Sequence, residues 1–124
     1  MKTGLIIYTS SLDRLANFYM HVFDLNLVES DSTYALLSSG KFELVLLVTE
    51  DSKNAFTSSL PRESTPIKPT FFVTSRLGVI AKKVKAKGGT MYPPKDWTFG
   101  GHSVCDGHDC EGNIFQLRLK EDAK

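Results

Sequence analysis

Two similar stretches of sequence decide the fold: Ile6-Ile7-Tyr8-Thr9-Ser10 and, 65 residues later, Phe71-Phe72-Val73-Thr74-Ser75. The similarity continues at the same offset, since Leu12 aligns with Leu77. Both stretches combine β-branched and aromatic residues and end in serine, a pattern typical of a strand that leads into a helix. Self-similarity at a fixed offset indicates that one structural unit occurs twice in the chain.

The first half predicts the element order βαβββ. A strand over residues 5–9 leads to Ser10 or Ser11, whose side chain is expected to cap a helix that extends to about Phe23. The apolar residues of this helix recur at three- and four-residue spacings and form one stripe: Leu12, Leu15, Ala16, Tyr19, Val22 and Phe23. Three strands are expected after it, near residues 26–30, 34–38 and 42–48.

The second half predicts the same order. A strand over residues 69–74 is followed by Ser75 as a cap candidate and by a helix that ends at Gly88-Gly89. The stripe of this helix is made of Leu77, Ile80, Ala81 and Val84. Strands are expected over residues 90–92, 103–106 and 114–119, with residues 109–113 forming a tight turn before the last one.

The module boundaries follow from this order. A chain of 124 residues is long enough for one domain with one core, residues 1–124. Module one covers about 1–50, a polar and proline-containing linker covers about 49–68, and module two covers about 69–120. A second echo, at an offset of 73 residues, aligns Phe42-Glu43-Leu44 with Phe115-Gln116-Leu117, so each module ends in a similar strand.

Charge and composition narrow the range of partners that the protein is expected to bind. Lys plus Arg total 15 against 14 Asp plus Glu, and this balance gives no electrostatic reason to expect nucleic acid or an anionic membrane. A small molecule is the expected partner. The apolar run at residues 4–7 is too short for a secretory signal or a membrane span, so a soluble, cytoplasmic protein is expected. Cys105 and Cys110 are compatible with free thiols in a reducing compartment.

At this point the chain resembles the vicinal oxygen chelate superfamily, which includes glyoxalases, bleomycin resistance proteins and extradiol dioxygenases. Two motifs carry the resemblance, which covers nearly the whole chain. Leu12-Asp13-Arg14-Leu15-Ala16-Asn17-Phe18-Tyr19 with Val22-Phe23-Asp24-Leu25 is similar to the family's first helix, and Asp109-Cys110-Glu111-Gly112-Asn113 is similar to its Asp-Pro-Asp-Gly-Asn turn. The resemblance implies an α+β fold in which two βαβββ modules form curled mixed sheets around a cavity. It also implies a homodimer.

The resemblance further implies four ligand positions for a metal, two in each module. They fall on Gly4, Glu43, Pro69 and Gln116. Glycine and proline have no side-chain donor, and glutamine offers only a neutral amide oxygen, whereas a catalytic divalent site generally needs about three protein ligands. We therefore expect no metal and no cofactor, and this puts metal-dependent glyoxalase or dioxygenase chemistry in doubt.

Several side chains are candidates for a ligand site. Glu43 is either a general base in an apolar cavity or a hydrogen-bonded carboxylate at the cavity wall. Gln116 is expected to orient a ligand or to pair with Glu43. Trp97 is either a stacking residue at the cavity mouth or a residue that closes the core. The other expected ligand-binding residues are Tyr8, Tyr34, Phe71 and His102.

A cluster of histidine and cysteine invites a zinc interpretation. It comprises His102, Cys105, His108 and Cys110. Consecutive positions of a strand point to opposite faces, so His102 and Cys105, three positions apart, are expected to diverge, and we favour unrelated strand and turn residues. Binding of an adventitious metal stays open, as does a nucleophilic role for Cys105.

Three functions are compatible with these observations. The first is a metal-free protein that binds or sequesters a small, partly planar molecule such as an aromatic antibiotic or metabolite. The second is a lyase or isomerase similar to glyoxalase, with Glu43 as base and an unconventional divalent metal site. The third is an interaction module without a ligand.

Overall fold

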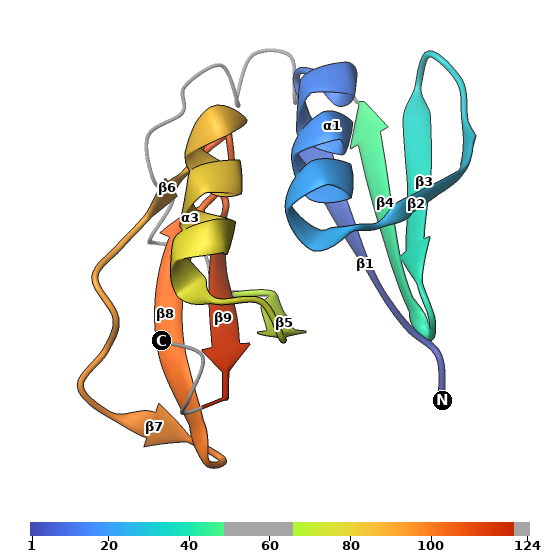
Figure 1. Cartoon of the computed structure of the whole chain (residues 1–124). Helices are drawn as coiled ribbons and strands as arrows, with labels where there is room; N and C mark the ends of the chain where they lie inside the picture. Colours follow the sequence, from blue (N-terminus) through green and yellow to red (C-terminus); the bar gives the residue numbers. More distant parts are fainter. Residues whose placement is uncertain (49–65, 121–124) are drawn as a thin grey trace. The chain divides into compact units, whose positions relative to one another are not determined.

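The computed structural model describes residues 1–48 and 66–120. The chain divides into two compact units, Met1–Ser58 and Ser59–Lys124, each considered by itself below (Figure 1). The predicted linker over residues 49–68 lies outside the described residues up to position 65. The remainder of that segment, residues 66–68, has no helix or strand.

Unit one has the predicted order βαβββ. Its elements are β1 (Thr3–Thr9), α1 (Leu12–Phe23), β2 (Asn26–Ser30), β3 (Tyr34–Ser39) and β4 (Phe42–Val48). The sheet has the order β1-β4-β3-β2, in which β1 runs parallel to β4 and the other neighbours are antiparallel. The α-helical stripe and the three strands are thereby confirmed.

The two faces of the unit-one sheet differ. Helix α1 contacts β3 and β4, and its buried side chains are Leu15, Ala16, Phe18, Tyr19 and Val22. The sheet contributes Leu37, Leu44 and Leu46 to this core, all without exposed surface. Alternation along each strand sends the residues between them to the opposite face. We call that second surface, which carries Gly4, Ile6, Tyr8, Leu36, Glu43 and Val45, the Glu43 face.

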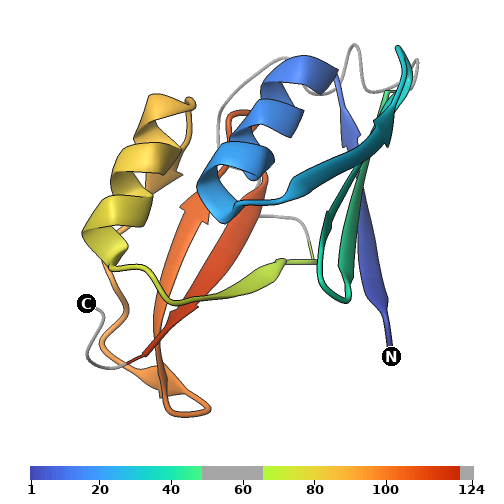
Figure 2. The same cartoon turned by 45° about the vertical axis from the view of Figure 1, so that its right-hand side comes forward.

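Unit two repeats the order with one addition. Its elements are β5 (Thr70–Val73), α3 (Leu77–Ala86), β6 (Thr90–Met91), β7 (Thr98–Phe99), β8 (His102–His108) and β9 (Ile114–Leu119). The sheet order β5-β9-β8-β6 matches that of unit one, and β7 pairs with β8 beside it (Figure 2). The fold is therefore α+β, with two mixed sheets and two helices.

Strand β7 was not predicted. It forms a short hairpin with the start of β8, pairing Phe99 with His102 across Gly100 and Gly101. Both glycines have positive φ, 55° and 79°, which two-residue hairpin turns require and glycine adopts without strain. The predicted strand over residues 103–106 was too short at both ends, because His102 pairs within this hairpin and residues 107–108 pair with β6 and β9.

The repeat is shifted by one residue in the parallel ladders. In unit one, Gly4 pairs with Glu43, but in unit two Thr70, not Pro69, pairs with Gln116. Proline has no amide hydrogen, so Pro69 contributes only its carbonyl, which accepts the Gln116 amide hydrogen bond at 2.8 Å. Every side chain of β5 therefore faces the side opposite to the one that the sequence repeat predicts.

Unit two also has two distinct sheet faces. Phe115, Leu117 and Leu119 are buried on one of them, together with Ile80 and Val84 of α3. The surface between these positions carries Thr70, Phe72, Val104, Asp106, Gln116 and Arg118, and we call it the Gln116 face. It is buried at Asp106 and Gln116 and exposed at Phe72.

Both helix caps differ from the prediction. Ser11 is the N-cap of α1, but its side chain makes no capping hydrogen bond, and its amide donates to Thr9 Oγ1 at 3.0 Å. The N-cap of α3 is Arg76 rather than Ser75, since the helix begins one residue later than expected. Neither helix in the described parts of the chain is long and apolar enough to cross a membrane.

The turn before β9 is confirmed, and one buried carboxylate organises it. Asp109 Oδ1 accepts hydrogen bonds from the amides of Glu111 and Asn113 at 2.9 and 3.0 Å, and the Asn113 side chain donates to both carboxylate oxygens. Gly112 closes the turn with φ 85°. This turn sets where β9 begins and therefore where Gln116 lies.

The close approach of β6 to β8 requires glycine at position 107. A Cβ there would lie 2.5 Å from Met91 Sδ and 2.8 Å from the Thr90 carbonyl oxygen, and the latter cannot withdraw without breaking the β6–β8 pairing. We expect Gly107→Ala to lower the free energy of unfolding by about 1–3 kcal/mol, measured by urea denaturation.

The matched control is Gly78→Ala in helix α3, where no described residue beyond its chain neighbours and the helix's own backbone lies within 4 Å of the added Cβ. Alanine favours the helix over glycine, so this variant should gain up to about 1 kcal/mol. Equal effects of the two substitutions would contradict the packing described for Gly107.

Candidate functional site

The Glu43 face of unit one is mainly apolar. On β4, Val45 lies between Ile6 of β1 and Leu36 of β3, and Leu47 lies between Tyr8 of β1 and Tyr34 of β3. Tyr8 and Ile6 are exposed. The expected ligand residues Tyr8, Tyr34 and Glu43 therefore lie on one face of this unit.

The polar groups of this face are already engaged. The Tyr34 hydroxyl donates to Glu29, and this hydrogen bond is the main reason that the pKa of Tyr34 is raised. Glu43 Oε1 lies 3.1 Å from Lys2 Nζ, with the two side chains 31% and 62% exposed. An exposed pair of this kind contributes little stability. Glu43 is thus a partly exposed carboxylate with a cation beside it.

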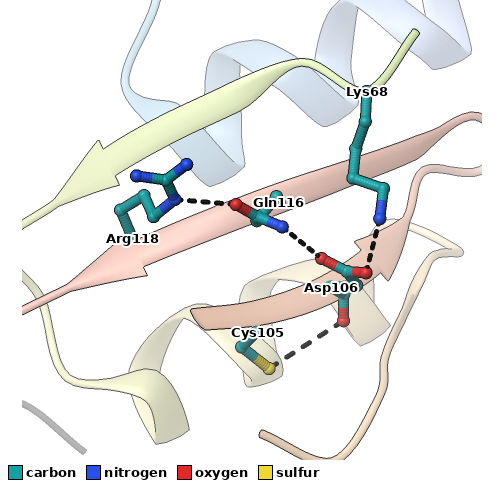
Figure 3. Close-up of polar contacts among 5 residues, drawn as sticks. All are labelled: Lys68, Cys105, Asp106, Gln116 and Arg118. Atoms are coloured by element: carbon teal, nitrogen blue, oxygen red, sulfur yellow. Dashed lines mark hydrogen bonds and ion pairs between the residues drawn. The ribbon is translucent and has the colours of Figure 1, made fainter. Parts of the chain in front are cut away.

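The Gln116 face of unit two carries a continuous hydrogen-bonded network, shown in Figure 3. Lys68 Nζ donates to Asp106 Oδ2 at 2.8 Å, and Gln116 Nε2 donates to Asp106 Oδ1 at 3.1 Å. Arg118 Nε donates to Gln116 Oε1 at 2.7 Å. We call these four residues the Lys68–Arg118 network.

The network fixes the orientation of the Gln116 amide. A carboxylate only accepts hydrogen bonds and a guanidinium only donates them, so the Nε2 atom must face Asp106 and Oε1 must face Arg118. Both Asp106 and Gln116 are 7% exposed. Because buried polar groups are costly without partners, each member of the network holds its neighbour in place.

Aromatic side chains surround the far end of the network. The Arg118 guanidinium lies 4.6 Å from the ring centre of Phe99 and 5.4 Å from that of Phe72. The Trp97 ring meets Phe99 edge to face at 5.8 Å, and the His102 ring meets Phe72 in the same way at 5.2 Å. Phe72, Phe99 and Trp97 are 66%, 54% and 46% exposed. Trp97 therefore does not close the core.

The residues that precede Trp97 in the sequence line a hollow. It has a volume of about 640 Å³ and is lined by residues 92–96, the loop that leads into Trp97. The loop is held to β8 by two backbone hydrogen bonds, from the Tyr92 amide to the Asp106 carbonyl and from the Lys95 amide to the Val104 carbonyl, both at 2.9 Å.

The structure separates Phe71 from the other expected ligand residues. Phe71 pairs with Leu117 and packs edge to face against Phe115 at 6.4 Å, so it lies on the side opposite to Gln116. Its neighbour Phe72 takes the place on the Gln116 face, as the one-residue shift of β5 requires. His102 and Trp97, by contrast, lie in the aromatic group beside Arg118.

Sequence reasoning missed Lys68, Asp106 and Arg118 as site residues. Two of them carried a signal: Arg118 lies two positions beyond Gln116 on one strand, and Asp106 is a charged residue inside an otherwise uncharged strand. Lys68 carried none, because it reaches Asp106 across 38 positions of the chain.

The histidine and cysteine cluster is divided between surfaces. Cys105 pairs with Leu117 on the helix-covered face, and its thiol donates to the Tyr92 carbonyl at 3.1 Å. His102 and His108 lie on the other face of β8, where their Nδ1 atoms contact the carbonyl oxygens of Gly100 and Asp109. The predicted divergence of His102 and Cys105 is confirmed. Within residues 1–48 and 66–120, no group of three such side chains is placed to hold a metal ion.

Cys105 is also poorly suited to act as a nucleophile. Burial raises the pKa of its thiol to about 11, the Asp106 carboxylate adds to the shift, and Lys95 opposes it. The reactive form of cysteine is the thiolate, which is scarce at neutral pH when the pKa is this high.

No family model and no curated protein matches the chain. Solved structures do match it over nearly its whole length. The fosfomycin resistance protein FosX of Listeria monocytogenes matches with a TM-score of 0.68 and 18% identity, over 96% of this chain and 90% of FosX. A glyoxalase-related enzyme of Fulvimarina pelagi has a TM-score of 0.71 and 14% identity, over 97% of this chain and 88% of that enzyme. Lactoylglutathione lyase of Agrobacterium tumefaciens has a TM-score of 0.64 and 18% identity, over 96% of this chain and 92% of the lyase.

The chain has the vicinal-oxygen-chelate fold. At identities of 14–18% this likeness concerns architecture, and it does not choose among the activities that the fold supports. The four expected ligand positions can now be placed: Gly4 pairs with Glu43, and Thr70 rather than Pro69 pairs with Gln116.

In neither unit do the residues at these positions fit a divalent metal. Gly4 has no side chain, and the ladder places Thr70, a neutral hydroxyl, beside Gln116. The carbonyl oxygen of Gln116 already accepts from Arg118 at 2.7 Å, so a cation bound there would meet a guanidinium. Only Glu43 offers a carboxylate, and Lys2 pairs with it. Zinc and related ions need more and better donors than this set provides.

The protonated, buried state of Cys105 predicts its reactivity. In the folded protein at about pH 7.5, we expect iodoacetamide to leave Cys105 unmodified, because the thiolate is scarce and access is blocked. The same reagent should label it in denaturant, as measured by peptide mass spectrometry. Rapid labelling of Cys105 in the folded protein would contradict the geometry and reopen a nucleophilic role.

Proposed function

We propose that the protein binds a small planar molecule on the Gln116 face without the help of a metal ion. The observation that carries the proposal is the exposed aromatic group Phe72, Trp97 and Phe99 beside a fixed polar network. Large apolar side chains that gather at a surface mark interaction sites more often than isolated ones do. Concave, mainly apolar surfaces with a few oriented polar groups are typical of small-molecule sites.

The donor set supports binding over metal-dependent chemistry. Neither Gly4 nor Thr70 supplies an anionic or imidazole ligand, and both ends of the Gln116 amide are engaged. The expected ligand contacts of Trp97 and His102 are part of this proposal, and Gln116 orients Arg118 through its hydrogen bond. The expected ligand contacts of Tyr8, Tyr34 and Glu43 concern the Glu43 face of unit one and stay predictions. The proposal also includes a homodimer, for which light scattering should give twice the 13.8 kDa chain mass.

The second candidate is a lyase or isomerase with Glu43 as base. It is favoured by the likeness to lactoylglutathione lyase and to FosX, one of whose structures contains Mn(II). Elemental analysis separates the two candidates. Stoichiometric Mn, Ni, Zn or Fe in protein purified without chelator, lost in Glu43→Ala, would favour the enzyme. Protein that is purified without such a metal and does not take one up would favour the binding protein.

The aromatic group provides the test of the first candidate. We expect Phe99→Ala to weaken binding of a planar ligand by about five- to tenfold, since one aromatic contact is worth about 1 kcal/mol. Planar antibiotics and aromatic metabolites would be screened by calorimetry and by the fluorescence of Trp97, the single tryptophan.

Val79→Ala is the control, because Val79 is an exposed apolar residue of α3 outside the aromatic group. This variant should bind as the wild type does. If no compound in the screen bound, or if both variants lost affinity equally, the proposal would fail.

A further inference from the structure

The aromatic group encloses a cation, and this points to the charge of the ligand. We propose that the guanidinium of Arg118 is an anion-recognition group, and that the ligand is a planar aromatic molecule bearing a carboxylate or a similar anionic group. The inference rests on the proposed function, because it names the ligand class of the same site. It follows from three features of unit two.

The first feature is the outer hydrogen-bonding edge of Arg118, for which the described residues provide no acceptor. Its Nε atom donates to Gln116 Oε1, and among the described residues this is the only side-chain acceptor that the guanidinium has. The two terminal nitrogens carry four further N–H donors in the same plane. Phe72 and Phe99 contact the guanidinium through their rings, and a ring face attracts a cation without accepting the in-plane hydrogen bonds. That edge matches a carboxylate, which accepts two parallel hydrogen bonds.

The second feature is the charge balance within the Lys68–Arg118 network. The single carboxylate, Asp106, forms its ion pair with Lys68 at 2.8 Å. Arg118 contacts the neutral amide of Gln116 instead, so the network as a whole keeps one positive charge at its aromatic end. An anionic ligand would compensate this charge, whereas a neutral ligand would leave it uncompensated beside three apolar rings.

The third feature is the way the guanidinium is held. Asp106 fixes the Gln116 amide, and the amide oxygen fixes Nε of Arg118, so the plane of the guanidinium is set before a ligand arrives. Preorganisation lowers the entropy cost of forming a two-point contact. In this arrangement Gln116 is a positioning residue, and Arg118 makes the contact.

The position of a bound carboxylate also indicates that the ligand contains an aromatic ring. A carboxylate paired with Arg118 lies next to Phe99, whose ring centre is 4.6 Å from the guanidinium, and Trp97 stands edge to face with Phe99. An aromatic ring attached to that carboxylate comes within stacking distance of these side chains. An aliphatic acid would gain the ion pair but lose the ring contacts.

The test compares two probes of the same shape, 2-naphthoate and its neutral analogue 2-naphthamide. Each would be titrated into the wild type and into Arg118→Gln, Arg118→Lys and Arg76→Gln, with dissociation constants from calorimetry and with the indole N–H signal of Trp97 followed by NMR. Arg76→Gln removes the same charge from an exposed position of the same unit. Thermal unfolding would confirm that each variant is folded.

We expect the wild type and Arg76→Gln to bind naphthoate at least about tenfold more tightly than naphthamide, because charge-assisted paired hydrogen bonds are roughly twice as strong as neutral ones. Arg118→Gln should abolish that preference. Arg118→Lys should keep part of it, since lysine keeps the positive charge but lacks the planar pair of N–H donors that binds a carboxylate at two points. It also serves as the second variant if Arg118→Gln does not fold.

Three results would overturn the inference, and they show whether the proposed function fails with it. If both probes shift the Trp97 signal and bind equally well, the planar-ligand proposal survives and the role of Arg118 as anion receptor is wrong. An unchanged naphthoate preference in Arg118→Gln would have the same meaning. If neither probe binds the wild type, the proposed function fails together with the inference.

Discussion

The hydrogen bond from Gln116 to Asp106 is the constraint on which the site depends. It joins the two central strands of unit two, β8 and β9, on the Gln116 face, and both side chains are buried. Lys68 balances the charge of Asp106. The Gln116 amide, oriented by Asp106, accepts a hydrogen bond from Arg118 Nε and so orients the guanidinium. Once this one bond is made, the order of the whole network follows, because the carboxylate only accepts hydrogen bonds and the guanidinium only donates them.

The two units therefore differ in chemistry although they share a topology. In unit one, the position equivalent to Gln116 is Glu43, a partly exposed carboxylate paired with Lys2 on a mainly apolar surface. In unit two, a neutral amide takes that place and its two ends are held by opposite charges. The network ends in the Arg118 cation, which contacts the rings of Phe72 and Phe99.

The sequence predicted the architecture well because periodicity and the internal repeat both report on local structure. Helix α1, the last strand and the Asp109 turn lie where their patterns placed them. The parallel register of β5 escaped prediction because it depends on Pro69, which lacks an amide hydrogen. As a result, Phe72 rather than Phe71 reaches the Gln116 face. The hairpin at Gly100-Gly101 had a recognisable turn signal, but the network did not, since Lys68 and Asp106 meet only after folding.

A double-mutant cycle on Asp106 and Gln116 tests the central claim most directly. The free energies of unfolding of Asp106→Ala, Gln116→Ala, the double variant and the wild type would be measured by urea denaturation under the same conditions. The account predicts a coupling free energy of about 1.5–3 kcal/mol, the range for a hydrogen bond to a charged group. Additivity within about 0.5 kcal/mol would show that the two residues act independently. That result would contradict a network that positions Arg118.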